Sequence, residues 1–428
     1  MLVAILLVSF FALMLIGTPI AICLGVSSVV TMLVQGAGRP VDIVMAAFPR
    51  LVLASTSKFV LLAIPFFILA GNIMSTSGIS KRLIDLAEAC VGHIKGGVAI
   101  ACVLATSFFA AMCGSGAAIV AALGLIMIPA LIKAGYSVAF AAALMAAGGA
   151  AGLVLPPSIT FIIYGSIADT SIGTLFIAGI LPGLLMSAAL LITALLIGRK
   201  YDLKVLPKAT LKQRWKAFKD AFFGLLIPFI ILGGIYGGVF TPTEAAAVAV
   251  AAGLFIGMFI YKTIKFKDLP KILIDSASTT AVIMIIIAAA SLFTYMLTLA
   301  RIDIAMGQAL TNLVGGNVIL FLLIVNIILL VAGCFLDATS ALFIFTPLFL
   351  PVATELGINP VHFGVIMVVN LAISLVTPPA GVDLFVAAGI AKVDVKPIVK
   401  AVMPLIVALI IVLMLITYIP AISLLLVR

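Results

Sequence analysis

The chain has 428 residues, of which 65% are hydrophobic and 9% are charged. A soluble protein could not bury that much apolar surface, so the composition predicts an all-α polytopic membrane protein. The net charge of +10 comes from clustered Lys and Arg, which basic cytoplasmic loops explain without a nucleic-acid partner.

Long apolar segments predict the membrane helices from the N-terminus onward. The first segment lacks a basic start and a cleavage site, so we expect a retained helix rather than a signal peptide. Two amphipathic stretches, 35–59 and 262–279, are expected to lie along the membrane surface. The apolar segments are 1–16, 18–35, 59–76, 96–133, 137–172, 175–198, 221–239, 242–261, 279–299, 316–353, 360–390 and 398–424.

Two of these segments, 96–133 and 316–353, are far longer than the ~20 residues that a membrane helix needs. Polar breaks interrupt them, 112-MCGSGAA-118 in the first and 334-CFLDATSA-341 in the second. Each segment is either two spans or a re-entrant helical hairpin with its polar tip at mid-membrane. A helix with a Pro-Pro pair follows each one, which favours two re-entrant hairpins.

Consecutive prolines interrupt the following segment in each half, within 155-LPPSITF-161 and 376-VTPPAGVD-383. Proline cannot donate a hydrogen bond and clashes with the preceding turn, so two broken helices are predicted. The freed N–H and C=O groups must be buried in protein or line a polar cavity. Oxygen atoms at such breaks suit Na⁺, and the positive ends of half-helices favour an anionic substrate.

The basic segment 199–220 carries eight Lys and Arg, two Asp and the only Trp. It is either a cytoplasmic surface (arm) helix that contacts anionic membrane lipid or a plain linker. It separates two halves, 1–198 and 221–428, whose Gly and Pro markers repeat at one constant offset along the sequence. Pro129, Gly135, Pro156, Pro157 and Pro182 recur as Pro351, Gly357, Pro378, Pro379 and Pro404.

Counting crossings from a cytoplasmic segment 199–219 predicts an inverted-topology repeat with both termini on the outer side of the membrane. In this threading 19 of the 24 Lys and Arg are cytoplasmic, as the positive-inside rule requires. The five on the outer side are Arg39, Arg50, Lys58, Arg301 and Arg428.

Polar residues at the first break are candidate ligands. Gly114 and Gly116 allow the backbone to turn sharply. The hydroxyl groups there belong to Ser115, Ser158 and Thr160.

The second half offers carboxylates as well as hydroxyl groups. Asp337 and Asp383 are costly at membrane depth, which favours ion binding, although Asp337 could be structural and Asp383 could cap its half-helix at an interface. Arg301 could bind a substrate carboxylate through its fork, or Asp303 could simply neutralise it. The hydroxyl groups belong to Thr339, Ser340 and Thr377.

The sequence lacks the residues that several classes of protein function require. No Walker signature is present, so ATP is not expected to drive the protein and an ion gradient must. Neither His93 nor His362 lies in a pattern of metal ligands. The sequence also suggests no Ser–His pair, so an enzyme is not expected. A passive channel would not need paired, inverted broken helices.

The motifs resemble those of one transporter family. The runs 240-FTPTEAAAVAV-250, 148-GGAAGLVLPPSI-159 and 334–393 are similar to the large membrane (permease) subunit of tripartite ATP-independent periplasmic (TRAP) transporters. The resemblance implies an elevator-type transporter of the bacterial inner membrane that imports organic acids, such as C4-dicarboxylates or sialic acids, with Na⁺. It also implies two partners, a periplasmic substrate-binding protein and a small four-helix membrane subunit. The implied scaffold is 1–92 and 221–312, and the implied transport elements are 93–198 and 313–428.

The resemblance further implies at least two Na⁺ sites, with the substrate between them. The alternative is a stand-alone Na⁺-coupled carboxylate or anion transporter of the same broad fold. The first implied site comprises Gly114, Ser115, Gly116 and Pro156. The second comprises Asp337, Thr339, Thr377, Pro378 and Gly381, and Asp383 is a further candidate Na⁺ ligand. The candidate substrate-binding residues are Ser115, Ser158, Arg301 and Asp337.

Overall fold

A computed structural model of the protein describes residues 2–38, 40–302, 307–308, 310, 313–379 and 381–427. These parts of the chain contain helices and no strand, and eight helices are long and apolar enough to cross a membrane. The predicted all-α membrane fold is confirmed. Arg39, Asp303 and Arg428 lie outside the described residues.

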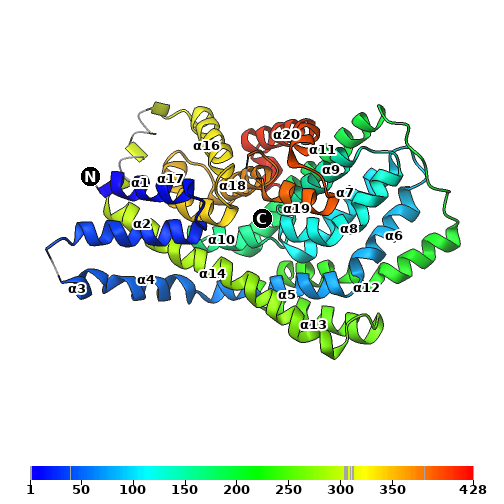
Figure 1. The fold of residues 1–428 in the computed structure, drawn as a ribbon, viewed down its shortest axis with the longest axis horizontal. Helices are drawn as coiled ribbons and strands as arrows, with labels where there is room; N and C mark the ends of the chain where they lie inside the picture. The colour runs from blue at the N-terminus through cyan, green and yellow to red at the C-terminus, as the bar shows by residue number, and fades with distance from the viewer. Residues whose placement is uncertain are drawn as a thin grey trace.

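The helices of the first half end at α11, and the second half begins within α12 (Figure 1). They are α1 (Leu2–Leu15), α2 (Ile20–Gln35), α3 (Val41–Met45), α4 (Ala47–Thr56), η1 (Phe59–Leu62), α5 (Ala63–Thr76), α6 (Ile79–Val91), α7 (Gly97–Cys113), α8 (Gly116–Lys133), α9 (Val138–Gly152), α10 (Ile159–Ala168) and α11 (Ile172–Gly198). Then follow α12 (Leu211–Tyr236), α13 (Pro242–Phe255), η2 (Ile256–Ile260), η3 (Phe266–Asp268), α14 (Leu269–Leu299), α16 (Val318–Gly333), α17 (Ala338–Glu355), α18 (Pro360–Ser374), α19 (Val382–Ala391), α20 (Val395–Tyr418) and α21 (Ala421–Leu424).

The predicted repeat is visible in the helix bounds. The offset that carries Pro156 to Pro378 also carries both ends of α8 to those of α17, and both ends of α9 to those of α18. The halves differ where α3, α4, η1 and α5 of the first half correspond to the single long helix α14 of the second. Helix α14 packs on α2, α4 and α5 and joins the left of the view to its lower edge (Figure 1).

The two halves are inverted with respect to each other. Beyond the first break, α10 packs on α17 and α18, which belong to the second half. Beyond the second break, α19 packs on α8 and α9, which belong to the first half. Each half-helix therefore continues onto the hairpin of the other repeat, which requires the hairpins to lie on opposite sides of the breaks. The predicted pair of helical hairpins in an inverted repeat is confirmed.

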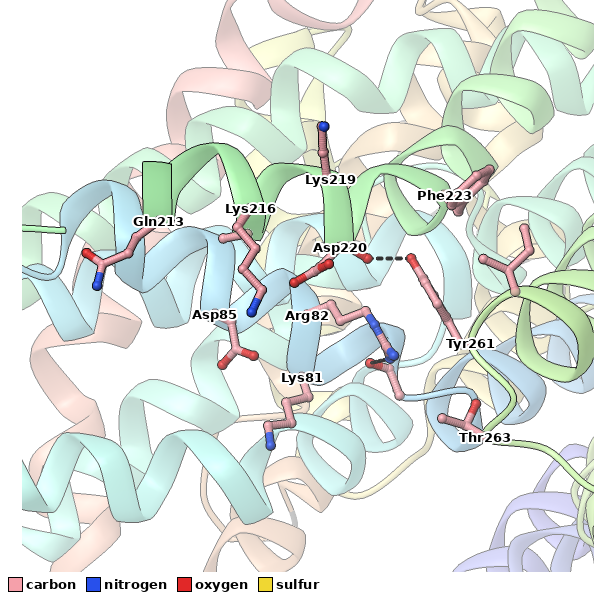
Figure 2. Close-up of a pocket in the computed structure, with 13 residues that line it drawn as sticks. Lys81, Arg82, Asp85, Gln213, Lys216, Lys219, Asp220, Phe223, Tyr261 and Thr263 are labelled. Atoms are coloured by element: carbon pink, nitrogen blue, oxygen red, sulfur yellow. Dashed lines mark hydrogen bonds between the residues drawn. The ribbon is translucent and has the colours of Figure 1, made fainter. Parts of the chain in front are cut away.

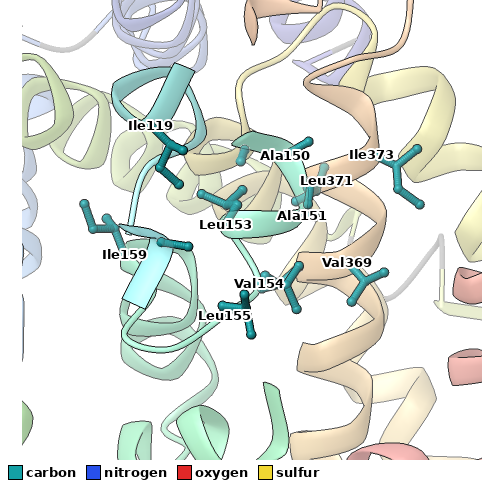
Figure 3. Packing of buried hydrophobic residues seen from close by; sticks show 14 of the residues in the cluster. Ile119, Ala150, Ala151, Leu153, Val154, Leu155, Ile159, Val369, Leu371 and Ile373 are labelled. Carbon is teal, nitrogen blue, oxygen red and sulfur yellow. The ribbon is translucent and has the colours of Figure 1, made fainter. Parts of the chain in front are cut away.

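Small residues let the centre of the fold pack closely. Helix α9 is made mostly of Ala and Gly, which allow neighbouring backbones to approach. A Cβ built on Gly152 would lie 2.9 Å from the Ala110 Cβ of α7. Helix α9 packs on α18, and Val154 in the turn after α9 lies near Val369 of α18 (Figure 3). The first break is thus enclosed by apolar side chains of both repeats.

One close contact between the repeats carries a stability prediction. A Cβ built on Gly364 would lie 2.6 Å from Cδ1 of Tyr164, whose hydroxyl donates to Pro360 O at 2.7 Å. We expect Gly364→Ala to destabilise the fold by about 1–3 kcal/mol because this buried ring cannot move without repacking. The matched control is Gly233→Ala, where the new methyl group meets nothing within 4 Å. Thermal unfolding in detergent should lower the midpoint of Gly364→Ala alone, and equal midpoints would contradict the expectation.

The basic region differs from its predicted outline. Residues 201–210 precede α12, and the predicted boundary after residue 220 lies inside this continuous helix. A capping box between Thr210 and Gln213 starts α12. Backbone hydrogen bonds join residues 201–210 to the first half. Lys204 N donates to Ala134 O at 2.9 Å, and Leu206 N donates to Gly92 O at 3.0 Å.

Two further elements depart from the sequence-based outline. Residues 269–279, expected along the membrane surface, form the first turns of the long helix α14. Helix α6 (Ile79–Val91) has no counterpart among the predicted segments, because it is strongly amphipathic and its charged residues interrupt any apolar run.

Candidate functional site

The tip of the first hairpin meets the first broken helix. Gly114 ends α7 with φ of 63°, a left-handed conformation that glycine adopts without strain. A Cβ on Gly114 would lie 3.0 Å from Pro157 O and 3.3 Å from Ile159 N. The structure therefore brings the predicted tip and the predicted break into direct backbone contact.

The hydroxyl groups at this contact are ordered by their neighbours. Ser158 is fully buried, and its Oγ lies 2.7 Å from the hydroxyl of Thr160. Ser115 is partly exposed and precedes the first residue of α8. Pro156 is buried, and the Pro156–Pro157 peptide bond is cis.

The tip of the second hairpin is organised by Asp337. Its carboxylate accepts hydrogen bonds from Thr339 N at 3.0 Å and Ser340 N at 3.2 Å, and Ser340 Oγ donates to it at 2.6 Å. Asp337 is thus the N-cap of α17, which satisfies amide groups that the helix start leaves free. The side chain is partly exposed, so lone pairs of the carboxylate remain available to a ligand.

The second break folds back on itself. A Cβ on Gly381 would lie 2.8 Å from Leu375 O and 3.1 Å from Thr377 O, so only glycine fits there. The hydroxyl of Thr377 donates to Ile373 O at 2.8 Å, which leaves its oxygen free to accept. Pro378 is partly exposed, and the Pro378–Pro379 peptide bond is also cis. Gly333, near the tip of the hairpin, packs directly against Ser374.

Asp383 does not lie where an interfacial cap would lie. It is fully buried in the first turn of α19, and its side chain caps no amide. A Cβ on Gly116 would lie 2.6 Å from Asp383 Oδ2, and one on Gly149 would lie 3.1 Å from the same atom. The carboxylate of the second half therefore contacts the hairpin of the first half. Gly149 was absent from the sequence-based candidates, because no polar atom of its side chain marks it.

Arg301 stands apart from the other candidates. It is exposed, has φ of 55°, and its guanidinium makes no hydrogen bond with any described residue. Its suggested neutraliser, Asp303, lies outside the described residues. Nothing in the described part of the chain joins Arg301 to the hairpin tips.

A separate polar cavity of about 870 Å³ lies between α6, α12 and the end of η2 (Figure 2). The charged residues that line it are Lys81, Arg82, Asp85, Lys216, Lys219 and Asp220. The Lys219 side chain extends away from the other five in Figure 2. The Arg82 guanidinium lies 3.7 Å from the centroid of the Tyr261 ring. Burial raises the pKa of Asp85, while the positive charges of Lys81 and Arg82 oppose this shift.

The chemistry of the tips suits a hard cation. No group of three or more His, Cys, Asp and Glu that could hold a metal ion occurs in the described residues. The break and tip regions offer instead carbonyl oxygens, hydroxyl groups and two carboxylates, which are the ligand types that hard cations prefer.

Comparisons with known proteins agree on one family. The family model described as "Tripartite ATP-independent periplasmic transporter, DctM component" matches residues 7–422. The chain is 44% identical to the "C4-dicarboxylate TRAP transporter large permease protein DctM" of Pseudomonas aeruginosa, over 87% of each chain. It is 41% identical to the "Isethionate TRAP transporter permease protein DctMQ" of Oleidesulfovibrio alaskensis, over 97% of this chain and 65% of that one.

A solved structure shares the fold. MtrF of Neisseria gonorrhoeae, described as an antimetabolite efflux pump, superposes with a TM-score of 0.64 over 94% of this chain and 95% of that one. The two sequences are 13% identical, so this likeness concerns the fold alone.

Proposed function

Because this chain belongs to the DctM family of tripartite ATP-independent periplasmic transporters, and is thus a transport protein rather than an enzyme, we propose that it imports an organic acid by Na⁺ symport. The observation that carries the proposal is the contact of the first hairpin tip with the first break, at Gly114 and Pro157. Such a contact gathers backbone oxygens at the depth where a coupling ion would bind.

Two Na⁺ sites follow from the repeat. The first uses backbone oxygens around the Gly114–Gly116 tip and Pro156, with the hydroxyl of Ser115. The second uses Asp337, Thr339, Thr377 and the backbone of Pro378 and Gly381. The Na⁺ ions supply positive charge beside which an anionic substrate binds. The chain's own residues hold the ions and orient the substrate.

The substrate would bind between the two tips. The hydroxyl groups of Ser115 and Ser158 can donate to its carboxylate groups, and the Asp337 carboxylate can accept from a substrate hydroxyl group. We propose an organic acid of the C4-dicarboxylate type ahead of sialic acid, supported by the name of a relative that is 44% identical. Arg301 would attract the substrate carboxylate from the outer side.

Two partners complete the proposed assembly, a small four-helix membrane subunit and a periplasmic substrate-binding protein. The name DctMQ of one relative, of which this chain covers 65%, supports a membrane partner. The test is uptake of labelled C4-dicarboxylate into proteoliposomes with and without the binding protein. We expect uptake only with it. Equal uptake without it would favour the stand-alone transporter.

We further propose an elevator mechanism in the bacterial inner membrane. Helices α7–α11 and α16–α21 would move against α1–α6 and α12–α14. Among the described residues, two side-chain hydrogen bonds join these groups, Lys58 Nζ to Ser166 O at 2.6 Å and Thr294 Oγ1 to Phe343 O at 3.0 Å. An interface with so few polar contacts favours sliding. Both termini would be periplasmic and the basic segment cytoplasmic.

In this orientation the cavity of Figure 2 faces the cytoplasmic leaflet, and we propose that it binds anionic lipid headgroups. Each Lys or Arg near an anionic membrane contributes about 1 kcal/mol to such binding. We expect the double variant Lys81→Gln and Lys216→Gln to lose most of the thermal stabilisation that phosphatidylglycerol gives the purified complex. Lys212→Gln, at the start of the same helix and outside the lining of this cavity, should keep it. Loss in both variants, or in neither, would contradict this site.

A further inference from the structure

Asp383 makes a contact between the repeats that neither hairpin site explains. Its side chain is 0% exposed, and neither Oδ1 nor Oδ2 has a hydrogen-bond partner among the described residues. An ionised carboxylate buried without a partner is strongly unfavourable, so such a group is retained where something compensates its charge.

Two backbone oxygens of the first half converge on the same place. Asp383 Oδ2 and Gly149 O lie 2.6 Å and 3.1 Å from one point, the Cβ position of Gly116. Gly116 O and Asp383 Oδ2 lie 2.8 Å and 3.1 Å from a second point, the Cβ position of Gly149. Two carbonyl oxygens and a carboxylate oxygen therefore border the space beside the two glycines, together with methyl groups of Val120 and Leu375.

The end of α9 leaves one of these carbonyl groups free. The amide of Leu153, four residues after Gly149, donates to Ala150 O at 3.1 Å instead of to Gly149 O. This tightened last turn releases the Gly149 carbonyl from the helical pattern. A free carbonyl oxygen beside an unpartnered carboxylate concentrates negative charge in a buried space, and a small cation would neutralise it.

The arrangement occurs once, although the fold repeats. At the offset that pairs the two halves, the positions equivalent to Asp383, Gly116 and Gly149 are Phe161, Ala338 and Leu371. All three equivalents are apolar and buried. The carboxylate is therefore not required by the repeated architecture, since the other half packs the same junction with hydrocarbon.

We propose that Asp383, Gly116 O and Gly149 O bind a third Na⁺, which ties the second broken helix to the first hairpin. This inference rests on the proposed Na⁺ coupling and extends it. Gly116 also borders the first proposed site, whereas Asp383 and Gly149 belong to neither of the two sites at the hairpin tips. A Na⁺ here holds α19 against α8 and α9, so its release loosens the unit that carries the substrate.

The test replaces the charge and keeps the shape. Asp383→Asn, in the complete complex with its partners, should lower the Hill coefficient for Na⁺ in uptake by about one. The Na⁺ concentration for half-maximal uptake should rise at least about tenfold. Gly389→Ala, on the same helix with nothing within 4 Å of the new methyl group, is the matched control and should change neither value.

A binding readout covers variants that fail to transport. NaCl should raise the thermal midpoint of the wild-type complex above that in choline chloride, as ligand binding to the folded state requires. The rise should be smaller in Asp383→Asn and in Gly149→Ala, whose methyl group would occupy the site. If NaCl raises the thermal midpoint of both variants as much as that of the wild type, the third site is wrong.

The two proposals fail in different ways. If wild-type uptake shows no dependence on Na⁺, the proposed symport itself is wrong. If wild-type uptake depends on Na⁺ and Asp383→Asn keeps the same Hill coefficient, only the third site is wrong. A variant that loses dependence on external pH while keeping the wild-type Na⁺ dependence would assign a proton to Asp383 and would also overturn the proposal.

Discussion

Asp337→Ala is expected to abolish Na⁺-driven uptake while the protein still inserts into the membrane. The carboxylate sits at the tip of the second hairpin, caps α17 and keeps lone pairs available to an ion. Loss of the cap alone would cost about 1 kcal/mol, which does not remove a membrane protein from its fold. The measurement is Na⁺-gradient uptake beside quantified protein in the membrane.

The control for this variant separates the cap from the charge. Asn is as good an N-cap residue as Asp, so Asp337→Asn should keep the hydrogen bonds to Thr339 N and Ser340 N. The Asp337→Asn side chain lacks the negative charge, so uptake should fall as much as in Asp337→Ala. Normal uptake with unchanged Na⁺ dependence in Asp337→Ala would contradict the proposed role of Asp337 in binding Na⁺. Restored uptake in Asp337→Asn would assign Asp337 to the cap alone.

Gly114→Ala is expected to reduce uptake strongly by separating the first tip from the first break. The new Cβ would lie 3.0 Å from Pro157 O and 3.3 Å from Ile159 N, which are backbone atoms that cannot rotate away. A left-handed alanine also costs roughly 1–2 kcal/mol. Uptake and thermal midpoint should both be measured.

Gly315→Ala isolates the contact from the backbone strain. Gly315 has φ of +56°, close to the +63° of Gly114, yet a Cβ there meets no atom of the described residues within 4 Å. It should carry a similar strain and transport normally. If Gly315→Ala loses as much uptake as Gly114→Ala, the effect is general strain, and the tip contact is not needed.

Much of the fold could be predicted from glycine and proline alone. These residues record backbone geometry, so the pairs Pro156–Pro157 and Pro378–Pro379 identified both the repeat and the two breaks. The polar tips at 114–116 and 337 followed, because polar residues are rare inside long apolar runs. The inverted arrangement followed from the distribution of Lys and Arg.

Other features could not be predicted from the sequence for physical reasons. Helix α6 carries Lys81, Arg82, Asp85 and Glu88, so a search for apolar runs passes over it. The partner of Asp383 lies in the other repeat, at Gly116 and Gly149, and the offset between repeats pairs equivalent positions rather than contacting ones. Every residue has a backbone carbonyl group, so the sequence does not show which glycine carbonyl could bind an ion. Only the packing of the backbone identifies Gly116 O and Gly149 O as candidates.

Uptake into proteoliposomes under a Na⁺ gradient is the decisive measurement for the proposed symport. The complete complex would be reconstituted with its small membrane subunit and binding protein, and a labelled C4-dicarboxylate would be supplied outside. With an inward Na⁺ gradient we expect the acid to accumulate above its external concentration, and we expect no accumulation when choline replaces Na⁺. Accumulation that is equal in choline and in Na⁺ would contradict it.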